Sequence, residues 1–289
     1  MLLNYDTILL IYNVATLEND ILLKIRDLIY HNSGIYFNEN KIHLLETRLK
    51  KRLEKLEFQS FEQYYDFLQA NKHSNEWKEL FDIITINESF FFRAPEQLEV
   101  LQKYIIPEII QNKKDNDATV RIWSAGCSTG EEPYSIAITI DEYLKSLYDK
   151  VKFQILASDI NTTALKKAKR GLYNNYAAKN LPIEILSKYF TISDNGYMIN
   201  DNIKNMVRFA NINLFDENQV KIAHNVDIIF CENVLIYFDI PSKEKTVALL
   251  YDILSPNGYL ILGYSESLHG ISKDFSLIHF PKVIVYKKT

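Results

Sequence analysis

The stretch from Val120 to Tyr134, VRIWSAGCSTGEEPY, most strongly constrains how this chain folds. It starts with an apolar, strand-like run, turns between Gly126 and Gly130, and continues in a pattern typical of a helix. A strand, a tight turn and a helix start present unpaired backbone N–H groups and the positive end of a helix dipole at a sheet edge. The stretch therefore predicts a ligand cradle.

The second half of the chain alternates between strand-like and helix-like segments. Strand-like runs occupy residues 120–124, 153–158, 207–210, 227–231 and 259–263, and residues 276–287, broken by Pro281, are typical of a closing antiparallel pair. This alternation predicts an α/β fold with a doubly wound, mostly parallel sheet and helices on both faces. Residues about 174–206 fit it poorly, and the run from Gly196 to Ile199 predicts a small inserted β-hairpin subdomain.

The chain before this region has a helical pattern. From Asn19 to about Ile86, apolar residues recur at spacings of three and four, which predicts a small all-α domain. The segment from Lys41 to Lys55 carries six Lys or Arg against two Glu, and we expect Arg48, Arg52 and Lys55 on one helix face opposite the leucines. Most runs of charged residues are solvent-exposed helix faces with no binding function. In an acidic chain, however, a basic face is a candidate docking site for an acidic partner.

Composition narrows the class of protein. With 289 residues, 47% of them hydrophobic, the chain is long enough for a large core. A net charge of -4 argues against nucleic acid as a partner. The first 14 residues lack a signal-peptide pattern, and no run of about 18 apolar residues predicts a membrane span, so we expect a soluble, cytoplasmic protein that is not membrane-embedded. Two isolated cysteines and no His cluster predict no metal site.

Three ligand classes compete for the cradle. The turn lacks the G-x-G-x-x-G of a dinucleotide site. It does match the G-x-S-x-G of a serine hydrolase through GCSTG, for which Asp227 and either His269 or His279 would have to complete a triad. That alternative leaves Asp159 unexplained, although this residue ends the next strand where such folds place a carboxylate on ribose hydroxyls.

An adenosyl cofactor accounts for more of the residues. Glu131 at the helix start is suited to accept hydrogen bonds from an ammonium group, and Asp159 from a ribose. Asn233 and Tyr237 follow the fourth strand and are expected at the same carboxyl edge, where ligands of open parallel sheets bind. Taken alone, Asp159 could instead cap the next helix and Tyr237 could belong to the core.

Five ordered motifs carry a resemblance that covers nearly the whole chain. The chain resembles the CheR family of chemotaxis receptor methyltransferases through NESFFFR at 87–93, WSAGCSTGEEPYS at 123–135, ASDI at 157–160, FCENVLIYF at 230–238 and GYSES at 263–267. The resemblance implies a Rossmann-like class I methyltransferase domain at 89–289, with the inserted subdomain at 174–206, and a receptor-docking helical domain at 1–88. It also implies transfer of a methyl group from S-adenosyl-L-methionine to receptor glutamates, leaving S-adenosyl-L-homocysteine.

The resemblance also implies site residues and a partner. The implied cofactor contacts are Asn87, Ser89, Arg93, Glu131, Asp159, Asn213, Leu214, Glu232 and Asn233, and Tyr237 is expected nearest the transferred methyl group. The implied partner is the cytoplasmic domain of methyl-accepting chemotaxis receptors, met through the basic helix Lys41 to Lys55 by a monomeric enzyme.

One departure from the family pattern reverses a charge, because Glu232 stands where the family usually has arginine, whereas Ser89 in place of the more usual threonine keeps the hydroxyl. This charge reversal motivates the alternative of a non-catalytic regulatory module that binds an adenosyl ligand without transferring the methyl group.

Overall fold

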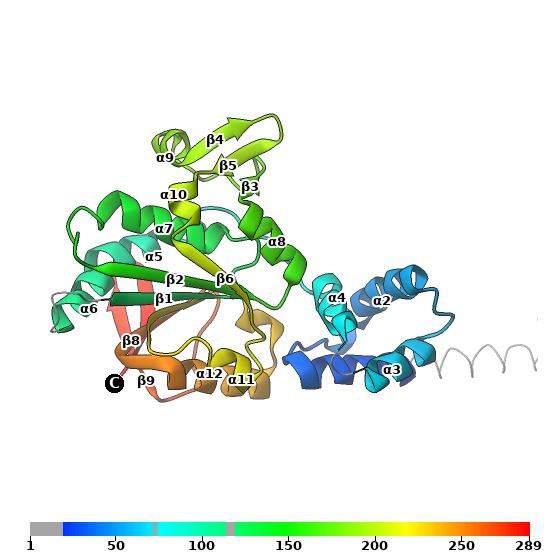
Figure 1. Cartoon of the computed structure of the whole chain (residues 1–289). Helices are drawn as coiled ribbons and strands as arrows, with labels where there is room; N and C mark the ends of the chain where they lie inside the picture. The colour runs from blue at the N-terminus through cyan, green and yellow to red at the C-terminus, as the bar shows by residue number, and fades with distance from the viewer. Residues whose placement is uncertain (1–19, 72–73, 114–118) are drawn as a thin grey trace, which may run out of the picture. The chain divides into compact units, whose positions relative to one another are not determined.

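The computed structural model describes residues 20–71, 74–113 and 119–289 (Figure 1). The prediction that no signal peptide is present concerns the first 14 residues, which lie outside the described ones. The chain divides into two compact units, Met1–Thr85 and Ile86–Thr289. In the described ranges, no helix has both the length and the apolar character needed to cross a membrane.

The first unit is all-α, as the periodicity predicts. Its helices cover residues 20–33, Glu39–Lys41 (η1), Ile42–Leu56 (α2), Phe61–Ala70 (α3) and Asn75–Ile84 (α4). The apolar positions at spacings of three and four form its core, and Ile25, Ile29, Leu45, Leu49 and Leu68 are fully buried. Burial of these side chains is the main favourable term for so small a helical unit.

The prediction that α2 presents an exposed basic face is wrong for Arg52, which is buried. Arg52 is only 6% exposed, and its guanidinium pairs with Glu76 of α4 through Nε–Oε1 at 2.8 Å and with Glu79 through Nη1–Oε2 at 3.2 Å. Arg48 donates to the carbonyl of Ile84. Helical periodicity placed these arginines opposite the leucines, but α4 covers that side and supplies the partners. Of the three predicted residues, Lys55 is exposed.

The second unit contains a seven-stranded sheet in the order β6-β2-β1-β7-β8-β10-β9 (Figure 1). Its strands are β1 (Thr119–Ala125), β2 (Lys152–Asp159), β6 (Val207–Asn211), β7 (Val226–Cys231), β8 (Leu254–Leu262), β9 (Phe275–Phe280) and β10 (Val283–Lys288). The first five are parallel, and β9 and β10 close the sheet in antiparallel fashion. The predicted α/β class, the five parallel strands and the closing pair are confirmed.

Helices cover both faces of this sheet. They are α5 (Pro95–Val100), the π-helical turn η2 (Leu101–Ile105), α6 (Ile106–Asn112), α7 (Glu131–Tyr143), α8 (Thr162–Arg170), α11 (Glu217–Val220), η3 (Leu235–Tyr237) and α12 (Ile240–Ile253). Successive β1 residues point to opposite faces. Ile122 accordingly packs in one apolar cluster with Ile136 of α7, whereas Trp123 packs in the other with Val247 of α12.

The inserted subdomain contains the predicted hairpin and one further strand. The hairpin joins β4 (Phe190–Ser193) to β5 (Gly196–Ile199), and β3 (Leu172–Tyr173) pairs with the other edge of β5; α9 (Ile183–Tyr189) and α10 (Asp201–Lys204) flank it. Gly196 has φ +127°, and a Cβ there would lie 2.1 Å from the carbonyl oxygen of Tyr173. Glycine is therefore required at position 196, where the backbone of β5 comes close to the end of β3.

Candidate active site

The turn after β1 is hydrogen-bonded to β2 and lies close to the loop after β7. The N–H groups of Gly126 and Cys127 both donate to the carbonyl oxygen of Ser158 in β2, at 2.8 Å each. Gly126 has φ +87°, and a Cβ there would lie 2.4 Å from Cγ2 of Val234, in the loop after β7. The sequence GCSTG therefore folds into a tight turn because glycine permits both the conformation and the close approach.

Asp159 ends β2 beside this turn and is 8% exposed. Its Oδ2 accepts the N–H of Ser128 at 2.7 Å, and its Oδ1 accepts the N–H of Asn161 at 2.8 Å. The cap of α8 is Asn161, whose Oδ1 accepts the N–H of Ala164. The carboxylate of Asp159 is thus fixed at the carboxyl edge of the sheet by backbone donors, and a carboxylate is a group that accepts hydrogen bonds from hydroxyls.

Glu131 is the first residue of α7 and is 3% exposed. The hydroxyl of Thr129 donates to both carboxylate oxygens at 2.8 Å, and the Ser89 side chain also hydrogen-bonds to Glu131. Burial raises the pKa of this carboxyl above its ordinary value, against the lowering effect of these hydrogen bonds. The geometry thus brings predicted residues Ser89 and Glu131 together from segments 42 positions apart in sequence.

A second group of carboxylates lies further along the same edge. Glu132 accepts from the buried hydroxyl of Ser124 at 2.7 Å, and burial raises its pKa to about 7. Glu266 accepts the backbone N–H groups of Asn233 at 2.7 Å and Gly263 at 2.9 Å. Burial, and then the charges of Glu132 and Glu266, raise the pKa of Glu232 well above its ordinary value.

Arg93 is a cation whose charge acts on two of these carboxylates, Glu132 and Glu232. Its charge lowers the pKa of both Glu132 and Glu232, although the effect of burial is larger for each. Its side chain is exposed, and its Nη1 donates to the carbonyl oxygen of Glu88 at 3.3 Å. Of the predicted residues, Arg93 thus acts electrostatically on Glu232, and Asn233 next to it donates its N–H to Glu266.

The remaining predicted residues lie on the segments around this edge. Asn213 follows β6, its N–H donates to Oε1 of Gln219 at 2.9 Å, and its Oδ1 accepts the N–H of Phe215 at 3.0 Å. Leu214 is buried in the apolar cluster that contains Trp123. Asn87 is half-buried in the segment before α5, and Tyr237 is half-buried at the end of η3.

Sequence reasoning missed Glu132 and Glu266 as members of this group. Glu132 adjoins Glu131, but only the helix geometry turns it toward Ser124. Glu266 lies in the motif GYSES, whose function the sequence left unassigned. In the described part of the chain, no three His, Cys, Asp or Glu side chains are arranged to hold a metal ion.

The donors and acceptors of the cradle suit an amino acid with an attached ribose. Glu131 offers a buried acceptor for an ammonium group and Asp159 an acceptor for hydroxyls. The buried Oγ of Ser128 has no hydrogen-bond partner among the described residues, so the turn retains a polar atom for a ligand. The chemistry of this set fits an adenosyl amino acid.

The serine hydrolase alternative fails on geometry. Asp227 lies at the start of β7, where it pairs with Lys113 at 2.7 Å and accepts the N–H of Arg121 at 2.8 Å. Ser128 lies beyond the opposite, carboxyl end of β1, which runs parallel to β7. The proposed acid and nucleophile are therefore at opposite edges of the sheet.

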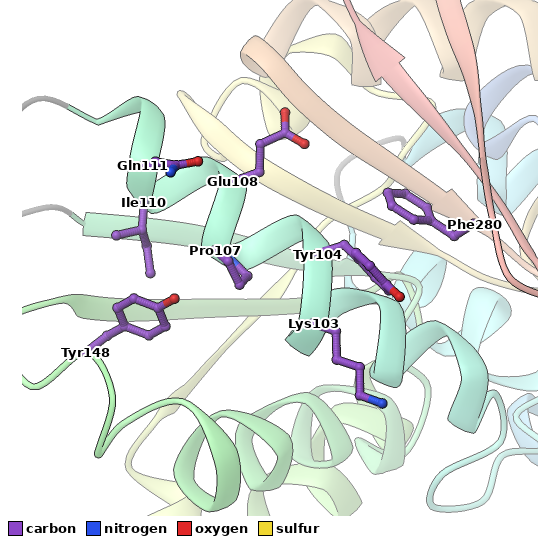
Figure 2. A pocket seen from close by; sticks show the side chains of 8 residues that line it. All are labelled: Lys103, Tyr104, Pro107, Glu108, Ile110, Gln111, Tyr148 and Phe280. Carbon is purple, nitrogen blue, oxygen red and sulfur yellow. The ribbon is translucent and has the colours of Figure 1, made fainter.

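A separate hollow of about 510 Å³ lies beside α6 (Figure 2). In Figure 2 the ring of Phe280 lies near that of Tyr104, and the two centroids are 5.1 Å apart. The hollow is lined by Lys103, Tyr104, Pro107, Glu108, Ile110, Gln111, Tyr148 and Phe280. None of the predicted site residues is among them, so the hollow is distinct from the cradle.

Comparison with known proteins gives matches over most of the chain. The family model described as the CheR methyltransferase SAM-binding domain matches residues 87–284, and the CheR methyltransferase all-alpha domain matches residues 21–85. The chain is 38% identical over 266 residues to chemotaxis protein methyltransferase 2 of Vibrio cholerae, covering 92% of this chain and 91% of that protein. Chemotaxis protein methyltransferases of Borreliella burgdorferi and Escherichia coli are each 34% identical, covering 88% of this chain and 90% and 86% of those proteins.

Proposed function

The chain belongs to the CheR methyltransferase family and is an S-adenosyl-L-methionine-dependent enzyme, and on that premise we propose how its own residues serve the methylation of receptor glutamates. The observation that carries the proposal is the placement of Glu131 and Asp159 on either side of the turn, within the segment that matches the SAM-binding domain. An acceptor for an ammonium group and an acceptor for hydroxyls are what the two polar parts of this cofactor require.

The cofactor supplies a methyl group bound to a positively charged sulfur. The acceptor, a glutamate carboxylate with an ordinary pKa of about 4.3, is already ionised at neutral pH, so the reaction needs no general base. What the chain must do is align the carboxylate oxygen with the methyl group and exclude water. Tyr237 at the end of η3 is proposed to lie nearest the transferred methyl group.

The other assigned residues hold the cofactor. Glu131 and Ser89 bind its amino acid part, and Asp159 binds the ribose while the N–H groups of Ser128 and Asn161 keep its carboxylate in place. The adenine side is assigned to the residues after β6, and the remaining contacts to the segments before α5 and after β7. These further contacts are Asn87, Arg93, Asn213, Leu214, Glu232 and Asn233.

The receptor is proposed to dock on the exposed lysines of the helical domain, taken as residues 1–88, and to be methylated by the domain at 89–289. Lys50 and Lys55 expose 60% and 70% of their side chains. Lys41 and Lys51 are also exposed, whereas Arg52 is buried and does not belong to the proposed docking surface. The enzyme is proposed to act as a cytoplasmic monomer.

Calorimetric titration with S-adenosyl-L-homocysteine tests the cofactor assignment. We expect micromolar-range binding, and we expect Asp159→Ala to weaken it by roughly tenfold or more, because the variant loses both the ribose acceptor and the acceptor that fixes the turn. Asp252→Ala, on the exposed side of α12, is the matched control and should bind normally. Absence of binding to the unmodified enzyme would refute the assignment.

Methyl transfer to receptor-containing membranes tests the substrate. Radiolabel from the methyl donor should appear in receptors as base-labile esters, since carboxyl esters hydrolyse in alkali whereas N-methyl groups do not. Cofactor binding without any transfer would instead favour the regulatory module that the charge of Glu232 suggested.

A further inference from the structure

Glu266 joins two loops at the carboxyl edge of the sheet. One loop follows β7 and contains η3, and the other follows β8. Glu266 lies in the second loop, where its N–H donates to the carbonyl oxygen of Gly263 at 2.9 Å, and its side chain is half-buried. Because β7 lies between β1 and β8 in the sheet, the loop after β7 lies between the turn after β1 and the loop that holds Glu266.

The carboxylate of Glu266 accepts backbone N–H groups from both loops. Its Oε2 accepts from Asn233 at 2.7 Å and from Gly263 at 2.9 Å, and its Oε1 accepts from Ile236 at 3.2 Å. Ile236 lies in the first turn of η3, where N–H groups have no partner within the helix, and the N-cap residue Val234 makes no side-chain cap hydrogen bond. Glu266 therefore caps η3 from 30 positions away in sequence.

The segment that Glu266 holds has a backbone conformation that needs support. Asn233 has φ +57°, in the left-handed region that residues other than glycine rarely adopt. Its N–H donates to a carboxylate, and such charge-assisted hydrogen bonds are roughly twice as strong as those between neutral groups. The packing is also close, since a Cβ at position 263 would lie 2.8 Å from Oε2 of Glu266 and 3.0 Å from the nitrogen of Asn233. Loss of the carboxylate should therefore release the segment.

The held segment borders the proposed cradle. Cγ2 of Val234 would lie 2.4 Å from a Cβ at position 126, so Val234 packs directly on the glycine turn. The loop of Glu266 is itself fixed by α5. The buried side chain of Gln97 donates to the carbonyl oxygen of Leu262 at 2.7 Å, and the hydroxyl of Tyr264 donates to a carboxylate of the same helix at 2.8 Å. Glu266 thus connects a fixed part of the fold to a segment that touches the cradle.

We propose that Glu266 is a positioning residue for methyl transfer, whose carboxylate holds residues 233–237 against the turn after β1 in the conformation that the reaction requires. The inference rests on the proposed function, which assigns Tyr237 of this segment to the reacting centre. Glu266 acts through the segment and not by contact with the reacting atoms. A displacement of about 1 Å can slow a reaction by about 100-fold. Cofactor binding is less sensitive, because Glu131 and Asp159 lie on other segments.

Glu266→Gln tests this role with little change of shape. The amide keeps one acceptor oxygen but places an NH2 group where the other oxygen accepts an N–H, so two donors face each other. We expect kcat for methyl transfer to fall roughly tenfold or more, while the Kd for S-adenosyl-L-homocysteine and the KM for the receptor change by less than about threefold. Glu266→Asp, which keeps a carboxylate, should recover part of kcat. Glu244→Gln, at an exposed position of α12, is the control and should leave kcat unchanged.

Two measurements separate positioning from a general loosening of the enzyme. Amide hydrogen exchange should accelerate roughly tenfold or more in the peptide that contains residues 233–237 and stay unchanged in β1 and β2. In a Tyr237→Phe background, Glu266→Gln should lower kcat by no more than about a further twofold, because both changes act through the same side chain.

Three results would overturn the inference. They are an unchanged kcat in Glu266→Gln, a loss of cofactor binding or of folding that matches the loss of kcat, and effects of the two substitutions that multiply in the double variant. Absence of cofactor binding or of methyl transfer in the unmodified enzyme would instead refute the proposed function.

Discussion

Replacing Arg52 by methionine tests whether the basic stretch of α2 stabilises the helical unit or serves a partner. The guanidinium is 6% exposed and meets the carboxylate of Glu76, itself 7% exposed, which also accepts the hydroxyl of Tyr64 at 2.7 Å. Burial, and then the hydrogen bond to Glu76, raises the pKa of Tyr64, so this hydroxyl stays a donor. Arg52 thus completes a buried polar network.

The expected cost of Arg52→Met is about 3–5 kcal/mol of unfolding free energy, because a buried carboxylate is left without its cation. Replacing both partners, in Arg52→Met/Glu76→Leu, should recover most of this loss and leave about 1–2 kcal/mol for the orphaned hydroxyl of Tyr64. Adding Tyr64→Phe should recover the remainder.

Urea unfolding followed by tryptophan fluorescence measures these differences. Trp77 lies in α4 beside Glu76, and a Trp123→Phe background leaves it as the single reporter, since the chain has only two tryptophans. Lys51→Met, at an exposed position of the same helix, should change stability by less than about 0.5 kcal/mol. The reasoning is refuted if Arg52→Met is as stable as this control, or if the double variant is no more stable than the single one.

Three further predictions concern the second unit. Gly126→Ala should destabilise the enzyme by about 1–3 kcal/mol in thermal unfolding, because φ is +87° and the new Cβ would overlap Val234. Burial raises the pKa of Glu132 from 4.5 to about 7, so the folded state holds a proton that the unfolded chain releases, and stability of the cofactor-free enzyme should fall as pH rises across that interval. Urea midpoints should show this loss to be smaller in Glu132→Gln. Tyr237→Phe should lower kcat while the Kd for S-adenosyl-L-homocysteine stays within about twofold, and an unchanged kcat would remove Tyr237 from the reacting centre.

The strands of the sheet could be predicted because each is an apolar run that ends at a glycine or polar residue. The parallel order followed from the alternation with helices, a rule that depends only on local pattern. The strand β3 was missed because it has two residues, and its pairing of Tyr173 with Tyr197 depends on a partner 24 positions away. Strands this short carry no periodicity of their own.

The candidate site, like the sheet, could be predicted only where local pattern determines the position of a residue. The placement of Glu131 and Asp159 at the carboxyl edge could be predicted because each begins or ends an element there, where parallel sheets bind ligands. The hydrogen bonds from Ser124 to Glu132 and from Asn233 to Glu266 depend on how separate strands and a loop are placed, which no short pattern specifies. Arg52 was misassigned for the same reason, because periodicity defines the faces of a helix but not what packs on them.

The buried Glu76 and the half-buried Glu232 differ in the groups that surround their carboxylates. Glu76 is balanced by the guanidinium of Arg52 and the hydroxyl of Tyr64, so its charge is satisfied by the fold itself. Around Glu232, burial and the charges of Glu132 and Glu266 raise the pKa of the carboxyl, and the charge of Arg93 lowers it. A cationic ligand bound beside such a carboxylate would offset its charge, and its binding would stabilise the folded enzyme by an amount set by the ligand concentration and its Kd.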